Sequence, residues 1–485
     1  MPKTGQLIAI DQGTSSTKGL LLDSNLRVLA TVSKPVELDT PESGWVQQDP
    51  EAIWESVRLA IDELSAQATE EILGLAITNQ RESALAWDVA TGKPLSAMLG
   101  WQDRRTASRV HEFSEQQSGA IRELSGLPLD PMFSALKFEW ILNQIDADRS
   151  RSQAGQIALG TLDTWLVYKL TGQLAAEAGN ASRTQLLNVA TGEWSQQLAE
   201  LFDVPLAALA PVVGSDAPTA PILAGPLAGK PVLAVLADSH AALYAHQLGS
   251  GATAKATFGT GSSIMALSPK PAAANSGLVT TVAWSIDGKL TSALEGNILS
   301  SGATVVWLGQ LLAKSPAELD QLAQSVGASA SEVNLVPAFG GLGAPWWDAH
   351  ASAIIDGMTL STGQAELALA AFEAINLQIE DVLAAVDNAT GQRLHAINVD
   401  GGPTSNLWLM QQQANLSQRT VVKNNVAELS ATGVAALALK VVGIDLTDYR
   451  ADNSSFEPNL ETSSAVARKS SWHAALAKSR MQRSN

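Results

Sequence analysis

The chain of 485 residues is too long for one compact hydrophobic core, so we expect two or three domains. Its 31 lysines and arginines face 48 aspartates and glutamates, and the net charge of −17 disfavours nucleic acid and anionic membranes as general partners. Cysteine is absent, which excludes thiol catalysis, disulfides and thiolate metal sites. The N-terminus does not read as a signal peptide and no apolar run approaches ~18 residues, so a cytoplasmic protein without membrane insertion is expected.

The first predicted element is a hairpin formed by two apolar runs, residues 7–10 and 19–22. Its turn contains Asp11, Gly13, four hydroxyl side chains at 14–17, and Lys18. Glycine lets a ligand approach the backbone, hydroxyls and amides can donate to phosphate oxygens, and an aspartate can hold magnesium through water. Turns between strands are also rich in these residues for conformational reasons. Phosphate binding is therefore one of two interpretations of this turn.

A helix is predicted for residues 51–64, with Asp49 as its N-cap and Pro50 in its first turn. The apolar residues 72–78 then predict a strand that ends in Asn-Gln-Arg81-Glu82. Ligands collect at the carboxyl ends of strands in open α/β sheets, and a guanidinium beside a carboxylate suits a molecule with adjacent hydroxyls. The alternative for Arg81 and Glu82 is a surface ion pair.

Trp101 lies in the next polar cluster, where it could line a small-molecule site or be a half-buried core tryptophan. Residues 133–141 and 161–170 predict helices, and the Pro-, Gly- and Ala-rich residues 212–230 predict a loop.

A second carboxylate follows a predicted strand at residues 231–237, where Asp238 precedes a helix at 241–247. A carboxylate at such a position can orient an alcohol and accept its proton during phosphoryl transfer. The alternative role for Asp238 is that of a helix N-cap.

The pattern of the opening hairpin returns at residues 255–267, where Thr260 lies between two glycines in the turn. Two such hairpins predict a duplicated architecture whose halves clasp a nucleotide. A third glycine-containing loop, residues 399–406, follows a predicted strand at 396–399 and precedes a helix at 407–413. The P-loop and dinucleotide-binding glycine motifs are both absent from the sequence.

Taken in chain order, these motifs resemble the FGGY carbohydrate kinases, and most closely their glycerol kinase branch, from about residue 6 to about residue 445. The motifs that carry the resemblance are Asp238 and residues 11–14, 78–82, 101–105, 258–261, 295–296, 337–348 and 400–402.

The resemblance implies an α/β fold of two actin-like (ribonuclease H-like) domains, with ATP and substrate in the cleft between them. It implies ATP-dependent phosphorylation of a terminal hydroxyl of a small polyol or sugar. The expected domains are 1–247 with the phosphate loop, substrate pocket and catalytic aspartate, 248–450 for nucleotide binding, and a C-terminal helix and tail at 451–485. For the oligomeric state, a homodimer is one possible assembly.

Carried over residue by residue, the resemblance implies that Asp238 is the general base and that Asp11 serves Mg²⁺. The implied substrate-pocket residues are Arg81, Glu82 and Trp101, and the implied nucleotide-binding residues are Thr14, Lys18, Thr260, Gly261, Gly302, Gly402 and Asn406. Lys18 stands where the family usually has an arginine, which keeps the charge but loses the bidentate fork.

Three further departures concern the substrate pocket. Met132, Ser239 and Ser263 stand where glycerol kinases have a tyrosine, a glutamine and a phenylalanine. Losing pocket-filling or hydrogen-bonding groups changes specificity, so a wider pocket for a four- or five-carbon polyol or ketose is expected. A xylulokinase-type ketopentose kinase is the alternative within the family, although Arg81-Glu82 favours the glycerol branch. An actin-like ATPase of the chaperone or filament type is the alternative from another class, which would not need the predicted substrate cluster.

Overall fold

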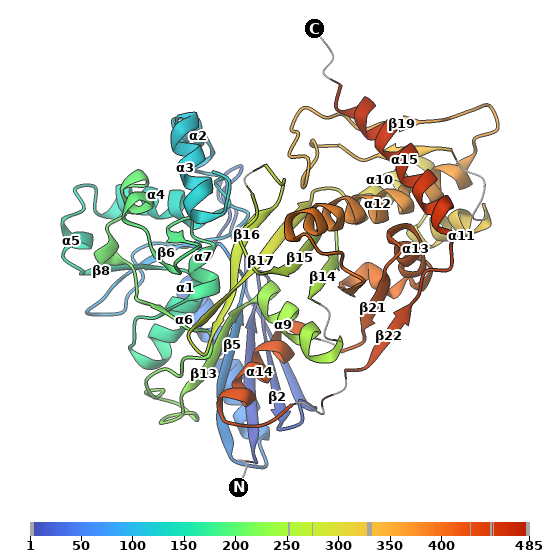
Figure 1. The fold of residues 1–485 in the computed structure, drawn as a ribbon. Coiled ribbons are helices and arrows are strands. Elements are labelled where there is room, and N and C mark those ends of the chain that lie inside the picture. The colour runs from blue at the N-terminus through green and yellow to red at the C-terminus, as the bar shows by residue number, and fades with distance from the viewer. Residues whose placement is uncertain are drawn as a thin grey trace. The chain divides into compact units, whose positions relative to one another are not determined.

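The computed structural model describes residues 4–250, 253–273, 275–326, 332–426, 428–446, 449 and 451–481. Contacts divide the chain into two compact units (Figure 1). The first comprises Met1–Leu248, Thr280–Ala293 and Ala427–Arg450, and the second comprises Gly249–Val279, Leu294–Val426 and Ala451–Asn485. Each unit is made of segments that alternate along the chain, whereas the expected domains 1–247, 248–450 and 451–485 are consecutive ranges. Those domain boundaries stay a prediction.

The first unit is built on a five-stranded sheet of order β13-β5-β1-β2-β3. Strand β1 is antiparallel to β2, which confirms the predicted opening hairpin, and parallel to β5, which is parallel to β13. Because β1, β5 and β13 are parallel, their carboxyl ends lie at the same edge of the sheet. The bounds are β1 (Gln6–Gln12), β2 (Ser16–Asp23), β3 (Val28–Pro35), β5 (Ile72–Asn79) and β13 (Val232–Ala237).

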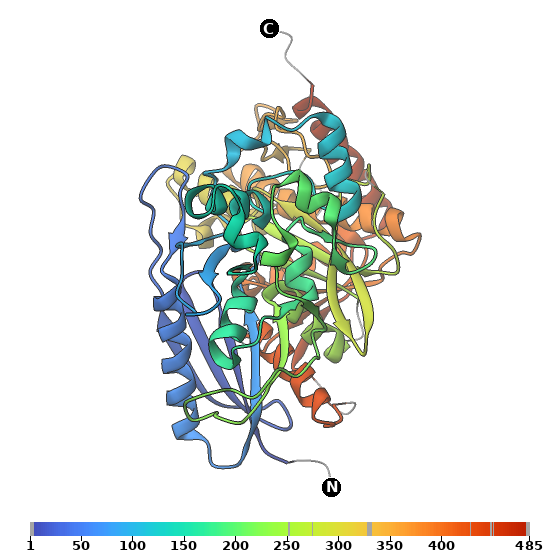
Figure 2. The same cartoon turned by 90° about the vertical axis from the view of Figure 1, so that its left-hand side faces the viewer.

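Helix α1 (Pro50–Gln67) covers one face of this sheet and is drawn beside its blue strands in Figure 2. The Asp49 side chain accepts a hydrogen bond from the Glu51 amide, which confirms the predicted N-cap. The helix buries Ile53, Val57, Ile61 and Leu64 in one cluster with Ile8 and Ile10 of β1. Helix α14 (Leu429–Val441) packs against β1, β5 and β13, although it comes from the far end of the chain.

The predicted helices at 133–141 and 161–170 are confirmed as α4 (Ser134–Ile145) and α6 (Leu162–Thr171). Residues 212–230 form a loop, apart from β12 (Val212–Val213), and α9 (Asp238–Ser250) follows β13 directly. The other elements within residues 4–248 are β4 (Gln47–Gln48), β6 (Leu85–Asp88), β7 (Met98–Leu99), α2 (Ala107–Val110), α3 (Glu115–Ser125), α5 (Ser150–Gln153), β8 (Ile157–Gly160), β9 (Ala176–Glu177), α7 (Ala178–Ser182), β10 (Leu187–Asn188), β11 (Glu193–Trp194), α8 (Gln196–Leu201) and the 3₁₀ helix η1 (Leu206–Ala208).

The second large sheet has the order β16-β17-β15-β14-β20-β21-β22. Strand β14 is antiparallel to β15 and parallel to β20, which is parallel to β21. A hairpin followed by two parallel strands therefore occurs in both units, in agreement with the predicted duplication. The bounds are β14 (Ala254–Phe258), β15 (Ser262–Ser268), β16 (Val279–Ile286), β17 (Lys289–Ile298), β20 (Ala396–Asp400), β21 (Thr420–Asn424) and β22 (Asn453–Phe456).

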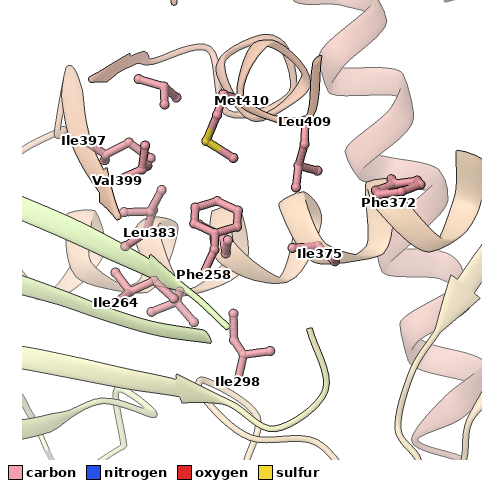
Figure 3. Close-up of a cluster of buried hydrophobic side chains, with 14 of the residues drawn as sticks. Phe258, Ile264, Ile298, Phe372, Ile375, Leu383, Ile397, Val399, Leu409 and Met410 are labelled. Atoms are coloured by element: carbon pink, nitrogen blue, oxygen red, sulfur yellow. The ribbon is translucent and has the colours of Figure 1, made fainter. Parts of the chain in front are cut away.

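The core of the second unit lies between this sheet and the long helix α12 (Gln364–Thr390) (Figure 3). Phe258, Ile264 and Val399 of the sheet are buried there with Leu383 of α12 and Met410. The remaining elements are α10 (Gly302–Leu312), α11 (Pro316–Ser325), β18 (Asn334–Val336), β19 (Ile354–Asp356), the 3₁₀ helix η2 (Gly402–Ser405), α13 (Leu407–Ser417) and α15 (Thr462–Ser479).

The C-terminal segment contains the predicted returning helix, α15, and also the edge strand β22, which the sequence did not predict. Asn453 to Phe456 lack an apolar alternation, and their strand conformation comes from antiparallel pairing with β21. Among the described residues, no helix has the length and apolar character needed to cross a membrane.

Candidate active site

Three predicted site residues meet at the carboxyl edge of the first sheet. Asp11 lies near the end of β1, Arg81 follows β5, and Asp238 follows β13. The Arg81 Nε atom lies 3.5 Å from Asp238 Oδ1 and 3.7 Å from Glu82 Oε1. Their side chains come together because three neighbouring parallel strands end at this edge.

Asp11 lies in a negative electrostatic potential that Asp238 and Glu428 create. Burial, followed by the charges of Asp238 and Glu428, raises the pKa of Asp11 to about 7, and Lys18 partly opposes this rise. A cation would relieve the repulsion among these carboxylates. Within the described residues, no three His, Cys, Asp or Glu side chains are grouped to hold a metal, whereas Mg²⁺ is commonly bound by one or two carboxylates together with substrate phosphates. The chemistry of Asp11 therefore fits a magnesium ion that arrives with a nucleotide.

The phosphate-loop candidate Thr14 and the pocket candidate Trp101 are in contact. The Trp101 Nε1 atom donates to Thr14 Oγ1 at 3.1 Å, and Thr14 Oγ1 donates to Gln80 Oε1 at 3.3 Å. Trp101 is 40% exposed, so it is half-buried, as the core alternative expects, and part of its surface stays accessible to a ligand. The turn between β1 and β2 is thus tied to the residues that follow β5.

The other candidate of this turn, Lys18, is held by a residue that sequence reasoning missed. The Lys18 Nζ atom donates to Glu428 Oε1 at 2.8 Å and to Oε2 at 3.0 Å. Glu428 immediately precedes α14 and belongs to the same unit, 410 residues further along the chain. A lone acidic residue in the sequence gives no sign of such a distant partner.

Glu82 is a buried anion with a buried cationic partner. The Arg183 Nε atom donates to Glu82 Oε1 at 2.6 Å, and the Arg183 guanidinium lies over the Phe133 ring at 5.2 Å from its centroid. The side chains of Arg81 and Glu82 are only 13% and 6% exposed. The interpretation of these two residues as a surface ion pair is therefore wrong, and Arg183 is a second partner that the sequence did not reveal.

Two of the three departures from the family pattern lie in the first unit. Ser239 follows Asp238 in the first turn of α9, and its amide donates to Asp238 Oδ1 at 2.5 Å. Asp238 is thus the first helical residue rather than the residue before the helix. The Met132 amide donates to Asp130 Oδ1 at 2.8 Å. Ser263 lies in the second unit, on β15, where its hydroxyl donates to Glu295 Oε1 at 3.3 Å.

The turn between β14 and β15 packs closely against the start of α10. A Cβ atom on Gly302 would lie 2.6 Å from the carbonyl oxygen of Gly259, and one on Gly261 would lie 2.4 Å from that of Ile298. The Gly302 amide donates to the Gly259 carbonyl, and the Ala303 amide donates to Thr260 O. Glycines are therefore required at 261 and 302 by backbone approach, and the amide of Gly302 is already engaged.

The glycine loop after β20 lies beside the same hairpin, because β20 and β14 are parallel neighbours. Gly401 has a φ of 96°, and a Cβ atom there would lie 2.0 Å from the Phe258 carbonyl oxygen. Gly402 begins η2, and a Cβ atom on it would meet nothing within 4 Å. The Asn406 side chain caps α13 by accepting from the Leu409 amide at 3.0 Å, and donates to Asp320 Oδ1 at 2.8 Å. Thr260, Gly261, Gly302 and Gly402 are thus gathered near adjoining strand ends of one unit.

Comparison with known proteins gives matches over nearly the whole chain. The N-terminal domain of the FGGY family of carbohydrate kinases matches residues 6–244, and the C-terminal domain of that family matches residues 254–441. A glycerol kinase from Alkalilimnicola ehrlichii is 38% identical over 482 residues, which are 97% of each chain. An apulose kinase from Pectobacterium atrosepticum is 37% identical over 497 residues, 99% of each chain. The crystal structure of Plasmodium falciparum glycerol kinase with ADP has a TM-score of 0.93 to this structure, at 27% identity and 99% coverage of each chain.

Proposed function

Because this chain belongs to the FGGY family of carbohydrate kinases, we propose that it transfers the γ-phosphoryl group of ATP to a terminal hydroxyl of a small polyol or sugar, with Asp238 as general base. Its fold is that of two actin-like (ribonuclease H-like) domains, and it is a carbohydrate or polyol kinase. The acceptor, the metal and the roles of individual residues are the proposed part.

The cluster of Asp11, Arg81 and Asp238 at one sheet edge supports this proposal most strongly. Asp238 would accept the proton of the attacking hydroxyl, and Arg81, 3.5 Å away, would hold that carboxylate in place. Glu82 and the exposed face of Trp101 would bind the remaining hydroxyls and the carbon skeleton of the acceptor.

Asp11 would hold Mg²⁺, which when bound supplies positive charge to the phosphate oxygens. Thr14 and Lys18 would contact the phosphates. The nucleotide-binding residues would be Thr260, Gly261, Gly302, Gly402 and Asn406. The close backbone packing at Gly261 and Gly302 supports a shape without side chains there, while the cap made by Asn406 gives that residue a structural role in addition.

The acceptor itself is proposed to be glycerol or a polyol or ketose with four or five carbons. Relatives named glycerol kinase and apulose kinase match to the same extent, so both a polyol and a sugar are compatible with the comparisons. Replacement of larger family residues by Met132, Ser239 and Ser263 supports the longer acceptors. A cytoplasmic location and a homodimer stay predictions.

The test is ADP release by the purified protein with Mg²⁺ and ATP, across glycerol, erythritol, ribitol, xylitol, ribulose, xylulose and apulose, with a reaction that lacks acceptor as control. One acceptor should stimulate ADP release well above the control. Equal ADP release with and without every acceptor would contradict this proposal and favour an actin-like ATPase.

A further inference from the structure

The first unit contains a lysine that no step of the proposed reaction uses. Lys137 lies on α4, and its side chain is fully buried. Its Nζ atom donates to three backbone carbonyl oxygens, those of Met132 at 2.6 Å, Gly100 at 2.7 Å and Glu82 at 2.8 Å. An ammonium group has three N–H donors, so these three carbonyls satisfy all of them.

Burying a cation in this way is costly. Burial lowers the pKa of Lys137 to about 7, and the nearby carboxylates of Glu82, Asp103 and Asp130 only partly oppose that change. An apolar side chain of similar length would fill the same volume without that penalty. The three carbonyls would then lose their donor, and the segments that carry them would lose their common anchor.

Each of the three carbonyls belongs to a segment that carries a proposed pocket residue. Glu82 and Met132 are themselves candidates, and Gly100 directly precedes Trp101. These segments are 55, 5 and 37 residues from Lys137 in the sequence. Glu82 also has a φ of 58°, a conformation that a glutamate rarely adopts and that surrounding contacts must maintain.

We propose that Lys137 is a positioning residue that sets the relative placement of Glu82, Trp101 and Met132, and thereby determines which acceptor the enzyme selects. This inference rests on the proposed function, because it takes those three residues as walls of the acceptor site. Lys137 touches no reacting atom in this role. It acts through the backbone of the three segments, because one ammonium group donates to a carbonyl oxygen of each and so holds them at fixed distances from one another.

The experiment compares Lys137→Met, which keeps the length of the side chain but removes its donors, with Lys137→Gln, which keeps two donors. The matched control is Arg149→Met. Arg149 is a buried cation of the same unit that donates to the carbonyls of Asp146 and Asp203, at 3.0 and 3.1 Å, and it touches no candidate site residue. For each protein we would measure kcat and KM for ATP and for two acceptors of different length, and the urea midpoint of unfolding.

We expect Lys137→Met to raise the KM for the preferred acceptor at least about tenfold, since misplacement by about 1 Å can cost up to about a hundredfold. The ratio of kcat/KM between the two acceptors should also change, while the KM for ATP stays within about twofold. Lys137→Gln should recover part of the acceptor preference. Arg149→Met should lower the urea midpoint and leave the acceptor ratio unchanged.

A folded Lys137→Met variant with wild-type acceptor KM and acceptor ratio would overturn the inference, and so would an equal change of the ratio in Arg149→Met. If neither Lys137 variant folds, Lys137 is a structural residue and the inference is wrong. Activity of the wild-type protein distinguishes failure of the Lys137 inference from failure of the proposed function. No acceptor-dependent ADP release by the wild type refutes the kinase proposal itself, whereas an active wild type with unchanged Lys137 variants refutes only the role of Lys137.

Discussion

The Nζ atom of Lys18 lies 2.8 and 3.0 Å from the two carboxylate oxygens of Glu428, so the cation proposed to bind phosphate already has an anionic partner. Glu428 also contributes to the raised pKa of Asp11. One acidic residue therefore acts on both charged candidates of the β1–β2 hairpin, the cation and the carboxylate. An incoming polyphosphate would compete with Glu428 for Lys18.

From this competition we expect Glu428→Gln to lower the KM for MgATP about two- to fivefold, the equivalent of the 0.5–1 kcal/mol of a partly exposed ion pair. Lys18→Met should raise the same KM. The matched control is Asp287→Asn, which removes the exposed partner of Lys440 at 3.3 Å in the same unit and should leave the KM unchanged. A higher KM in Glu428→Gln would show that Glu428 assists nucleotide binding instead.

Replacing Asp238 by asparagine should lower acceptor-dependent ADP release by about 10²- to 10⁴-fold, because the amide cannot accept the hydroxyl proton. The dissociation constant for MgADP, measured by calorimetry, should change little, since Asp238 is assigned to the acceptor and not to the nucleotide. Turnover at the wild-type rate would remove Asp238 from the mechanism.

The buried pair of Glu82 and Arg183 leads to a prediction about stability. Arg183→Met would leave Glu82 as a buried anion without its 2.6 Å partner, which should cost about 3–5 kcal/mol in the free energy of unfolding. In the double variant Arg183→Met with Glu82→Gln, much of that loss should be regained because the charge is gone. Urea unfolding of the wild type, the two single variants Arg183→Met and Glu82→Gln, and the double variant measures the coupling energy between the two side chains. Strictly additive losses of stability would contradict the prediction.

Glu177 gives a prediction of pH dependence. Burial raises the pKa of this side chain from 4.5 to about 7, against hydrogen bonds from Ser215 and from the amides of Gly179 and Asn180. Between pH 4.5 and about 7, Glu177 therefore carries a proton in the folded state that it has lost in the unfolded state. The stabilisation that this proton gives the folded state is fully present below pH 4.5 and is lost as the pH rises through about 7. Relative to Glu177→Gln, the wild type should lose up to about 3 kcal/mol over this range. Parallel stability curves for the two proteins in urea would refute the shift.

Gly302 offers a test of the close packing between the β14–β15 turn and α10. Gly302→Ala should destabilise the protein by about 1–3 kcal/mol, since the new Cβ would lie 2.6 Å from the Gly259 carbonyl oxygen. The matched control is Gly119→Ala in α3, where a Cβ meets nothing within 4 Å. That change should stabilise by about 0.5–1 kcal/mol, because alanine is the better helix former. Thermal or urea unfolding distinguishes the opposite signs.

Local patterns in the sequence were sufficient for many elements of the fold. Both hairpins, helix α1 with its Asp49 cap, and the placement of Asp238 directly after β13 follow from apolar periodicity, turn residues and capping, each of which acts over a few neighbouring residues. The order of the motifs along the chain was sufficient to identify the family. Strand β22 was missed because its residues carry no apolar alternation and pair only at the edge of an existing sheet.

The tertiary structure decided which charges meet. Glu428 reaches Lys18 across 410 residues, Arg183 reaches Glu82 across 101, and Lys137 reaches the Glu82 carbonyl across 55. Whether Arg81 and Glu82 are exposed or buried depended on which elements cover them, which their own sequence does not encode. Periodicity and capping are short-range properties of the chain, whereas burial and ion pairing are set by the strand order that brings distant segments to one sheet edge.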